Sequence, residues 1–426
     1  MTVLKGSCQK MGKHIVIIGG GVIGLSTAWV LIKNGHQVHM LEREQTPGLV
    51  TSFANGGQLS YRYVAPLADR GVPLQGLKWM GKADSPLNLR LRMSVSQWQW
   101  LMQFILACNR NTHQVNSEHL LRLSLFSKQV MQNWLDEGGL ANFDWHRSGK
   151  LVVHRKERAF DNAASNTDPK FQQVLNAEEC VKLEPALTHI ARELRGGIYS
   201  PGDETADCQK FCRALLEQLN LSGNFKLTTG CEVQKFQRRE NFINAVLTTK
   251  GKIEGEEFVV AAGNGSRKLL GETDVSVPLY PLQGYSLTMP YPAPGIAPSV
   301  SVTDYDHKIV YARLGDRLRI AAMVDIGYAE SGLRPQRLSA LKRVVAESFP
   351  LLKGLDDAEV WSGLRSATPE GLPLIGRTAQ SNLWMNIGQG SLGFTLAAGC
   401  ATVLGMLIDN VSPTISLTGR SWSNNT

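Results

Sequence analysis

Three glycines near the start of the chain have the spacing of a dinucleotide-binding turn. Gly19, Gly21 and Gly24 follow the apolar run at 14–18 and open a helical pattern. In such a unit the first glycine permits a tight turn, the second lets the backbone approach a pyrophosphate, and the third lets the helix pack on the sheet. The phosphates then lie at a helix N-terminus, where free N–H groups favour negative charge.

An acidic residue supports this interpretation. Glu42 follows the second apolar run, at the distance of about 20 residues where a carboxylate binds ribose hydroxyls. A carboxylate at this place would repel a 2′-phosphate, which argues against NADP. An ordinary glycine-rich turn between a strand and a helix is the alternative. The residues predicted to contact the nucleotide here are Ile18, Gly19, Gly20, Gly21, Val22, Ile23, Gly24, Glu42 and Arg43.

Arg365 is the residue best placed to hold a carboxylate. It lies between two glycine-proline turns in the segment 361–376. Its planar guanidinium matches a carboxylate with two parallel hydrogen bonds, although an arginine in a surface ion pair is the alternative. Four tyrosines in strand patterns could add hydroxyl groups to a pocket or simply pack: Tyr280, Tyr285, Tyr305 and Tyr311.

Two glycine-rich segments suit contact with a flat polar ring. The loop at 43–60 is small and polar, and its candidate residues are Thr51, Ser52, Asn55, Gly57 and Gln58. The second segment repeats the strand–glycine–helix pattern, and a helix N-terminus there could stabilise negative charge that develops on a ring. Its candidates are Gly388, Gln389, Gly390, Leu392, Gly393 and Thr395. A surface loop and close helix–strand packing are the respective alternatives.

Composition excludes several classes of protein. The 426 residues are 43% hydrophobic and 19% charged, which is typical of a globular chain large enough for two domains. The net charge of +8 comes from scattered basic residues, a distribution that does not indicate nucleic-acid binding. Seven cysteines without a C-x-x-C pair, and no histidine pair at ligand spacing, favour free thiols in a reducing compartment over a metal site.

The sequence predicts a soluble or peripheral protein. Residues 1–13 lack the apolar core of a signal peptide, and we recognise no apolar run that would span a bilayer. We therefore expect a cytoplasmic location, with the inner face of the cytoplasmic membrane as the alternative. The tryptophan-containing segment 94–109 is predicted to be an internal helix, although docking on a bilayer or on a partner stays open.

Patterns of strands and helices indicate an α/β fold with two interleaved architectures. Parallel strand–helix units occur at the start, middle and end, while antiparallel strands and helices fill the gaps. This predicts a Rossmann-like nucleotide-binding domain and an α+β substrate domain built on a mostly antiparallel sheet. The nucleotide-binding domain is expected at 13–60, 201–263 and 359–415, the substrate or cap domain at 61–200 and 264–358, and flexible tails at 1–12 and 416–426.

Together these motifs resemble the FAD-dependent oxidoreductases of the D-amino acid oxidase and glycine oxidase superfamily. The resemblance covers about residues 13–410 and is greatest to the FAD-bearing small subunit of bacterial D-amino acid dehydrogenases. Its specific marks, besides the first glycine turn, are Thr51-Ser52 with Asn55-Gly-Gly-Gln58, Asp203-Glu204-Thr205, Tyr280-Pro-Leu-Gln-Gly-Tyr-Ser-Leu-Thr288 and Gly363-Leu-Arg365.

The resemblance implies FAD rather than NAD, and oxidation of D-amino acids to 2-oxo acids and ammonia. It implies that Arg365 clamps the substrate carboxylate, that Tyr285 and Tyr311 line the substrate pocket, and that electrons pass to a quinone or another acceptor. It implies flavin contacts from the loop at 51–58 and from 388–395. Further cofactor contacts are expected at Val233, Ala262 and Gly263.

Departures from the family pattern leave the substrate open. This chain has Gln389 between two glycines where such dehydrogenases often carry histidine, Ser366 where proline often follows the arginine, and Glu370 in place of an aspartate. Related activities on proline, hydroxyproline, sarcosine or glycine, an oxidase that uses oxygen, and a flavin-bearing subunit that serves assembly are the alternatives.

Overall fold

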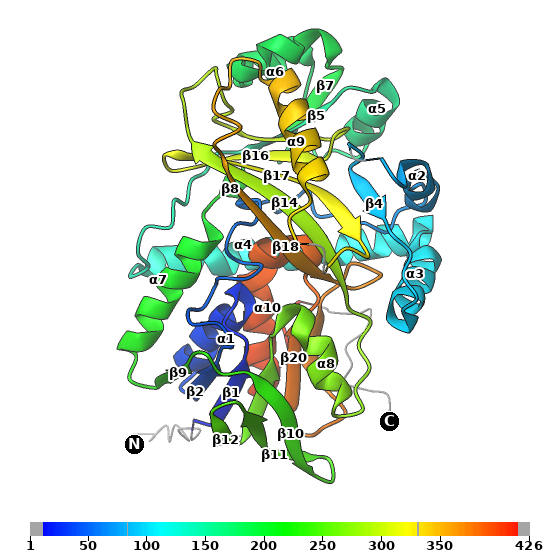
Figure 1. The fold of residues 1–426 in the computed structure, drawn as a ribbon. Coiled ribbons are helices and arrows are strands. Elements are labelled where there is room, and N and C mark those ends of the chain that lie inside the picture. The colour runs from blue at the N-terminus through cyan, green and yellow to red at the C-terminus, as the bar shows by residue number, and fades with distance from the viewer. Residues whose placement is uncertain (1–11, 83, 330–331, 416–426) are drawn as a thin grey trace, which may run out of the picture.

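The protein contains two large sheets, one above the other (Figure 1). The structure is a computed structural model that describes residues 12–82, 84–329 and 332–415. The tails predicted at 1–12 and 416–426 lie outside the described residues, apart from Gly12.

The lower sheet has six strands, and all neighbours except β19 and β20 run parallel. Its alternate side chains point to two different cores: Ile15 and Ile17 face the helices, whereas Val16 and Ile18 face a small antiparallel sheet. The strand order is β19 (Leu374–Arg377), β20 (Leu383–Ile387), β13 (Glu257–Val260), β1 (His14–Ile18), β2 (Gln37–Leu41) and β9 (Phe225–Thr228). The small sheet is β10 (Val233–Arg239), β11 (Phe242–Thr248) and β12 (Gly251–Glu254).

Helices from distant parts of the chain pack on the lower sheet. The central helix, α10, contacts α1 and α4, and all of them contribute to one core. These helices are α1 (Val22–Lys33), α4 (Arg110–Glu137), α7 (Cys208–Leu221) and α10 (Gly393–Ile408).

The upper sheet has nine strands and is mostly antiparallel. The strand order is β18 (Glu359–Ala367), β14 (Tyr280–Pro290), β17 (Arg317–Ile326), β16 (Ile309–Leu314), β15 (Ser301–Asp304), β5 (Lys150–His154), β7 (Gly196–Ser200) and β6 (Gln173–Leu175), with β4 (Leu87–Leu89) beside β17. Helix α9 (Pro335–Ser348) packs on one face of it. The fold class predicted from the sequence is therefore confirmed.

Smaller elements connect and flank these layers. Two short strands pair beneath the upper sheet, and two helices lie at its right-hand edge in Figure 1. These are β3 (Gln58–Leu59) with β8 (Glu204–Thr205), and α2 (Val72–Trp79) with α3 (Val95–Ala107); the others are α5 (Glu157–Ser165), α6 (Ala177–Leu183), α8 (Ser266–Gly271) and the 3₁₀ turns Pro185–Glu193, Gly263–Gly265 and Gly390–Leu392.

The domain boundaries differ from the predicted ones at two places. The predicted boundary at 359 places β18 in the nucleotide-binding domain, but β18 pairs with β14 and so belongs to the upper sheet. The predicted boundaries place helix α4 in the cap, but its Leu120, Leu123 and Trp134 pack in the core of the lower layer. The reason is that an amphipathic pattern shows that a helix has a buried side without showing which core receives it.

Helix α10 corrects the expectation that the chain has no apolar run of membrane-spanning length. The stretch Gly390–Ile408 is 19 residues long with a mean hydropathy of 1.8, enough to cross a bilayer by length and composition. It is mostly buried, between α1 and α4. In this fold it is a core helix, apolar all round because protein surrounds it.

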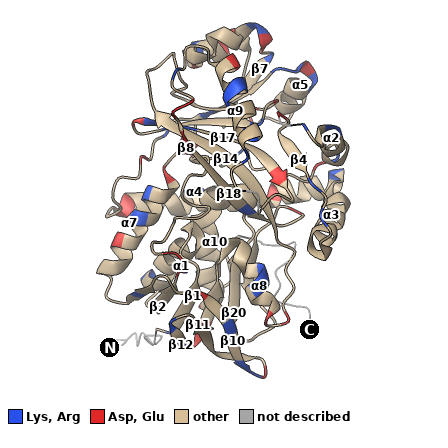
Figure 2. Cartoon of the chain, in the orientation of Figure 1, with Lys and Arg blue, Asp and Glu red and all other residues tan. Residues whose placement is uncertain are grey.

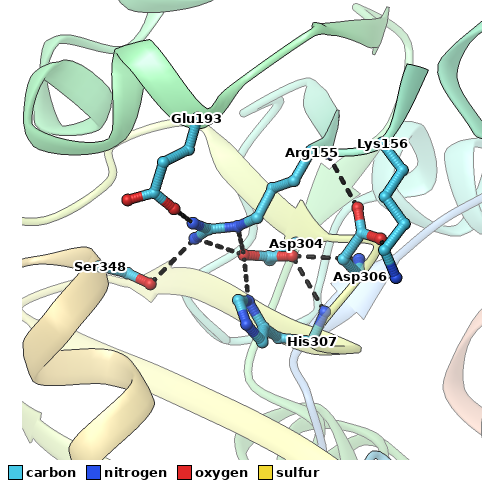
Figure 3. A network of polar contacts seen from close by, with 7 residues as sticks. All are labelled: Arg155, Lys156, Glu193, Asp304, Asp306, His307 and Ser348. Atoms are coloured by element: carbon cyan, nitrogen blue, oxygen red, sulfur yellow. Dashed lines mark hydrogen bonds and ion pairs between the residues drawn. The ribbon is translucent and has the colours of Figure 1, made fainter.

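A buried carboxylate joins the upper sheet to its neighbours (Figure 3). Asp304, at the end of β15, accepts hydrogen bonds from Arg155 Nε at 3.0 Å and Nη2 at 2.8 Å. Its other oxygen accepts the backbone N–H of His307 at 3.1 Å. Arg155 also pairs with Glu193 and donates to Ser348 Oγ on α9. Burial alone would raise the pKa of Asp304, but the hydrogen bond from His307 and the charge of Arg155 offset it and hold the pKa at about 2.

Candidate active site

At two of the three turn glycines, a side chain would collide with the backbone of the protein. Gly19 has a φ of +111°, and a β-carbon there would lie 2.5 Å from the carbonyl oxygen of Ala261. A β-carbon at Gly24 would lie 1.9 Å from the carbonyl oxygen of Gly19. These contacts confirm the expected tight turn and close packing of α1.

Gly21 differs, because nothing in the protein crowds it. A β-carbon there would meet only Ser52 Oγ, at 3.5 Å, which is ordinary contact. The space in front of Gly21 is therefore free for a ligand that needs close approach to the backbone. Ser52 lies beside it and accepts the N–H of Val22 at 3.0 Å, so the loop at 51–58 meets the N-terminus of α1.

Glu42 is buried at the end of β2 and fixed by backbone donors. One carboxylate oxygen accepts the N–H of Gly20 at 2.6 Å and the other accepts the N–H of Glu44 at 2.8 Å. The N–H of Cys231 donates to the Glu42 carbonyl at 2.8 Å, which brings the segment before Val233 alongside. An acid beside a glycine turn with open space at its second glycine fits a dinucleotide such as FAD.

The other predicted cofactor segments meet near β18. The carbonyl of Leu364 accepts hydrogen bonds from Thr51 Oγ1 and from Asn264 Nδ2, both at 2.9 Å. Gln389 forms a bridge with Ala367, at the end of the same strand. The loop at 51–58, the turn after Gly263 and the segment at 388–390 therefore converge on the strand that carries Arg365.

Within these segments several side chains have protein partners. Asn55 Oδ1 accepts the N–H of Gly57 at 3.1 Å, and Thr395 Oγ1 lies 3.5 Å from the carbonyl of Gln58. Gly388 and Gly390 have φ values of +82° and +57°, which favour glycine. Arg43 is exposed and pairs with Glu44. Cofactor contacts by these residues, and by Ile23, Ala262, Leu392 and Gly393, stay predictions.

Arg365 lies flat on the upper sheet because two glycines face each other across β14 and β18. Gly284 pairs with Gly363. A β-carbon at Gly284 would lie 2.6 Å from Arg365 Nη2, and one at Gly363 would lie 2.0 Å from the Trp361 ring. Trp361, Gly363 and Arg365 alternate along one strand and so share a face. The glycine pair leaves room for an indole and a guanidinium side by side.

The position of Arg365 is fixed by an unusual carbonyl. Its Nη1 donates to the carbonyl of Met323 at 2.9 Å. Met323 is buried with a φ of +67°, a left-handed conformation that is rare outside glycine, at a bulge where β17 shifts register against β14. Burial lowers the pKa of Arg365 to about 10, with the Asp325 charge opposing the shift. The guanidinium is therefore positively charged at neutral pH.

The structure does not bring Tyr285 and Tyr311 together with Arg365. Tyr285 is the strand neighbour of Gly284, so its side chain leaves the opposite face. It is 1% exposed and donates to Asp325 Oδ2 at 2.8 Å. Tyr311 is equally buried and packs edge-on against Phe349, below α9. This placement corrects the expectation that either ring lines the pocket around Arg365.

Sequence reasoning missed three residues that lie near these segments. Trp361 shares the face of Arg365, and Asn264 supports the adjacent carbonyl. Lys150 is 3% exposed and donates to Gln58 Oε1 at 2.7 Å and to Ser60 Oγ at 2.6 Å; burial lowers its pKa to about 8. The alternation of Trp361, Gly363 and Arg365 could have identified the first, whereas the other two depend on tertiary contacts. Among the described residues no group of three His, Cys, Asp or Glu side chains could hold a metal.

Comparison with known proteins agrees with this geometry. The family DAO, FAD dependent oxidoreductase, matches residues 14–407. D-amino acid dehydrogenase 2 of Pseudomonas aeruginosa is 47% identical over 410 residues, covering 96% of this chain and 98% of that protein. D-amino acid dehydrogenase 2 of Ralstonia nicotianae is 39% identical over 416 residues, covering 95% and 98%. Glycine oxidase from Geobacillus kaustophilus has a similar fold, with a TM-score of 0.74, 20% identity and coverage of 97% and 100%.

The fold and the glycine turn define an FAD-dependent oxidoreductase. The chain belongs to the DAO family, as its match over nearly the whole length shows. FAD, when bound, supplies a ring that accepts a hydride from the substrate. The residues that would hold its adenosine and pyrophosphate are those around Gly21 and Glu42.

Proposed function

We propose that the chain oxidises D-amino acids to 2-oxo acids and ammonia. The observation that carries the proposal is the Arg365 guanidinium, held flat on the Gly284–Gly363 pair beside the converging loops. The names of the two relatives support an amino acid as substrate. A planar, fixed guanidinium is suited to a carboxylate, which every amino acid offers.

The protein's own part in this reaction is to bind and orient. Arg365 holds the carboxylate, so that the α-hydrogen of the bound substrate has a fixed orientation in the site. The neutral amine then loses a hydride to give an imino acid, and water converts this to a 2-oxo acid and ammonia. No side chain is required as a general base, because the substrate amine loses its proton beforehand. The rate should therefore rise with pH as the amine becomes neutral.

We further propose that the electrons pass to a quinone at the inner face of the cytoplasmic membrane. Oxidation of the amine releases two electrons and two protons, and these reduce one quinone to a quinol. An oxidase that uses oxygen is the second candidate. Steady production of hydrogen peroxide during turnover would identify the oxidase.

The decisive experiment is an anaerobic titration of the purified holoenzyme. D-amino acids should bleach the visible absorbance of bound flavin, whereas L-amino acids, glycine, sarcosine and L-proline should leave it unchanged. Bleaching by one of the other amines alone would transfer the assignment to that substrate. Flavin that no amine bleaches would favour a subunit that serves assembly.

A further inference from the structure

Helices α2 and α3 lie near one another at one edge of the molecule and expose apolar side chains (Figure 1). On α3 these side chains recur at helical spacing, opposite the buried Trp100, Leu101 and Phe104. We call the whole set the apolar face: Leu74, Leu77, Met80, Leu91, Met93, Val95, Trp98, Met102, Ile105 and Leu106. The predicted internal helix at 94–109 is thus buried on one side only.

The exposure on the apolar face is large. Met93 is 106% exposed, and Val95 and Leu106 are each 74% exposed. Single exposed apolar residues are ordinary, but ten within two short helices and their connection are not. A surface of this kind indicates a partner that is itself apolar.

Basic residues outnumber acidic ones in the segment that carries the apolar face. Residues 70–110 contain six Lys or Arg and one acidic residue, Asp84, which pairs with Arg343 at 3.3 Å. Figure 2 shows basic residues on α2 and on the nearby α8. The basic residues of the segment are Arg70, Lys78, Lys82, Arg90, Arg92 and Arg110. Basic side chains around an apolar surface are complementary to anionic lipid headgroups above an acyl layer.

A cavity opens beside this face. It has a volume of about 1130 Å³, and Met93 and Arg92 line it on the side of α3. On the other side it reaches Asn264, whose amide holds the carbonyl that precedes Arg365. Asn264 Oδ1 is buried and has no hydrogen-bond partner among the described residues. The cavity therefore runs from the residues that precede α3 to Asn264, and Asn264 is in turn hydrogen-bonded to the strand that carries the arginine.

We propose that the apolar face docks on an anionic bilayer, and that a lipid-soluble quinone enters the cavity at Met93. The part about the quinone rests on the proposed function, whereas the docking of the face does not. Docking presents the mouth of the cavity to the lipid, so a quinone reaches the protein without crossing water. A second copy of this chain or a partner protein on the same face are the other occupants that the experiment separates.

The experiment compares two triple variants of the holoenzyme. Met102, Ile105 and Leu106 become Gln in the first, because they lie on the exposed stripe of α3 and away from the cavity. Leu221, Leu351 and Phe171 become Gln in the control, because they are also exposed apolar residues but lie elsewhere. Binding is measured by co-sedimentation with phosphatidylglycerol vesicles and with phosphatidylcholine vesicles.

We expect wild type and control to bind the anionic vesicles, with binding weakened by salt and by phosphatidylcholine. The α3 variant should bind at least about tenfold more weakly. Its oxidation of D-amino acids with a soluble dye should be unchanged, while reduction of vesicle-embedded quinone should fall in parallel with binding. Vesicle binding equal to that of wild type would overturn the proposal.

Two further results separate the possible failures. If size-exclusion chromatography shows a wild-type dimer that the α3 variant converts to a monomer, the face is a subunit interface and the proposal is overturned. If vesicles bind as expected but no amine reduces the flavin, the proposed function fails while docking stands. If the α3 variant reduces vesicle-embedded quinone as fast as wild type does, the proposal that quinone enters the cavity from the docked bilayer at Met93 is refuted.

Discussion

The guanidinium of Arg365 rests on the α-carbon of Gly284. A β-carbon at Gly284 would lie within 2.6 Å of Nη2 and 2.7 Å of Cζ. The obstacle is the end of a flexible side chain rather than backbone, so the arginine can move while the fold persists. The glycine therefore determines where the guanidinium lies and, on the proposed function, where the substrate carboxylate would be held.

Gly284→Ala should keep its flavin and its melting temperature but lose activity. A displacement of about 1 Å at a positioning group lowers kcat/KM by up to about 100-fold. Steady-state kinetics with a D-amino acid measures this. Gly76→Ala, where a β-carbon makes only ordinary contact with Leu87, is the control and should keep wild-type kinetics. If Gly284→Ala and Gly76→Ala both keep wild-type kinetics, Gly284 does not determine the position of the guanidinium.

Removal of the guanidinium should have a larger effect. Arg365→Ala should lose about 2–5 kcal/mol of transition-state stabilisation, because a buried charge pair with the carboxylate disappears. Arg365→Lys should recover part of the loss, since a point charge replaces the planar fork. The ratio of kcat/KM values measures both. Near-normal kcat/KM in Arg365→Ala would remove this residue from the site.

Alanine at Gly24 should reduce the stability of the protein, whereas alanine at Gly21 should weaken the binding of FAD. Gly24→Ala places a carbon 1.9 Å from the backbone oxygen of Gly19, so thermal unfolding should show a destabilised or unfolded protein. Gly21→Ala meets no obstacle in the protein and should fold. It should nevertheless bind FAD at least about tenfold more weakly, because its methyl group would fill the space in which we expect the pyrophosphate to bind. Fluorescence titration of the apoprotein with FAD tests this, and tight binding by Gly21→Ala would be the contrary result.

Asp304 should make the free energy of unfolding depend on pH in the acidic range. Its pKa is about 2 in the folded protein and ordinarily 3.8, so the folded state binds the proton less readily than the unfolded state. The contribution of about 2 kcal/mol is present above pH 4 and is lost as the pH falls from about 4 to 2. Asp304→Asn should flatten the dependence of unfolding free energy on pH in that window. Asp356→Asn, whose side chain is 99% exposed, is the control and should follow wild type.

Tyr285→Phe tests the role inferred from family resemblance. The hydroxyl donates to Asp325, which also pairs with the fully buried Arg337 at 2.8 Å. Burial and the charge of Asp325 raise the pKa of this phenol, so it stays protonated and acts as a donor. Its loss should reduce stability by about 1 kcal/mol and leave KM unchanged. If KM rises strongly while the stability stays normal, Tyr285 lines the substrate pocket as the family resemblance implies.

Local spacing determines how much of this molecule can be predicted from its sequence. The turn at Gly19, Gly21 and Gly24 with Glu42 is a continuous strand–helix–strand unit, so its residues suffice to identify it. The faces of Tyr285 and Arg365 depend on strand register, and the bulge at Met323 shifts that register. Lys150 meets Gln58 only through the tertiary fold. Such contacts between distant segments leave no periodic signal in the sequence.

The carbonyl of Leu364, held by Thr51 and Asn264, has a consequence for the protein without its cofactor. β18 is the outermost strand of its sheet, and these two side chains shield its free edge. If the loop at 51–58 loosens when FAD leaves, that edge is bared and can pair with another chain. Cofactor saturation would then protect the protein against aggregation, in addition to enabling its chemistry.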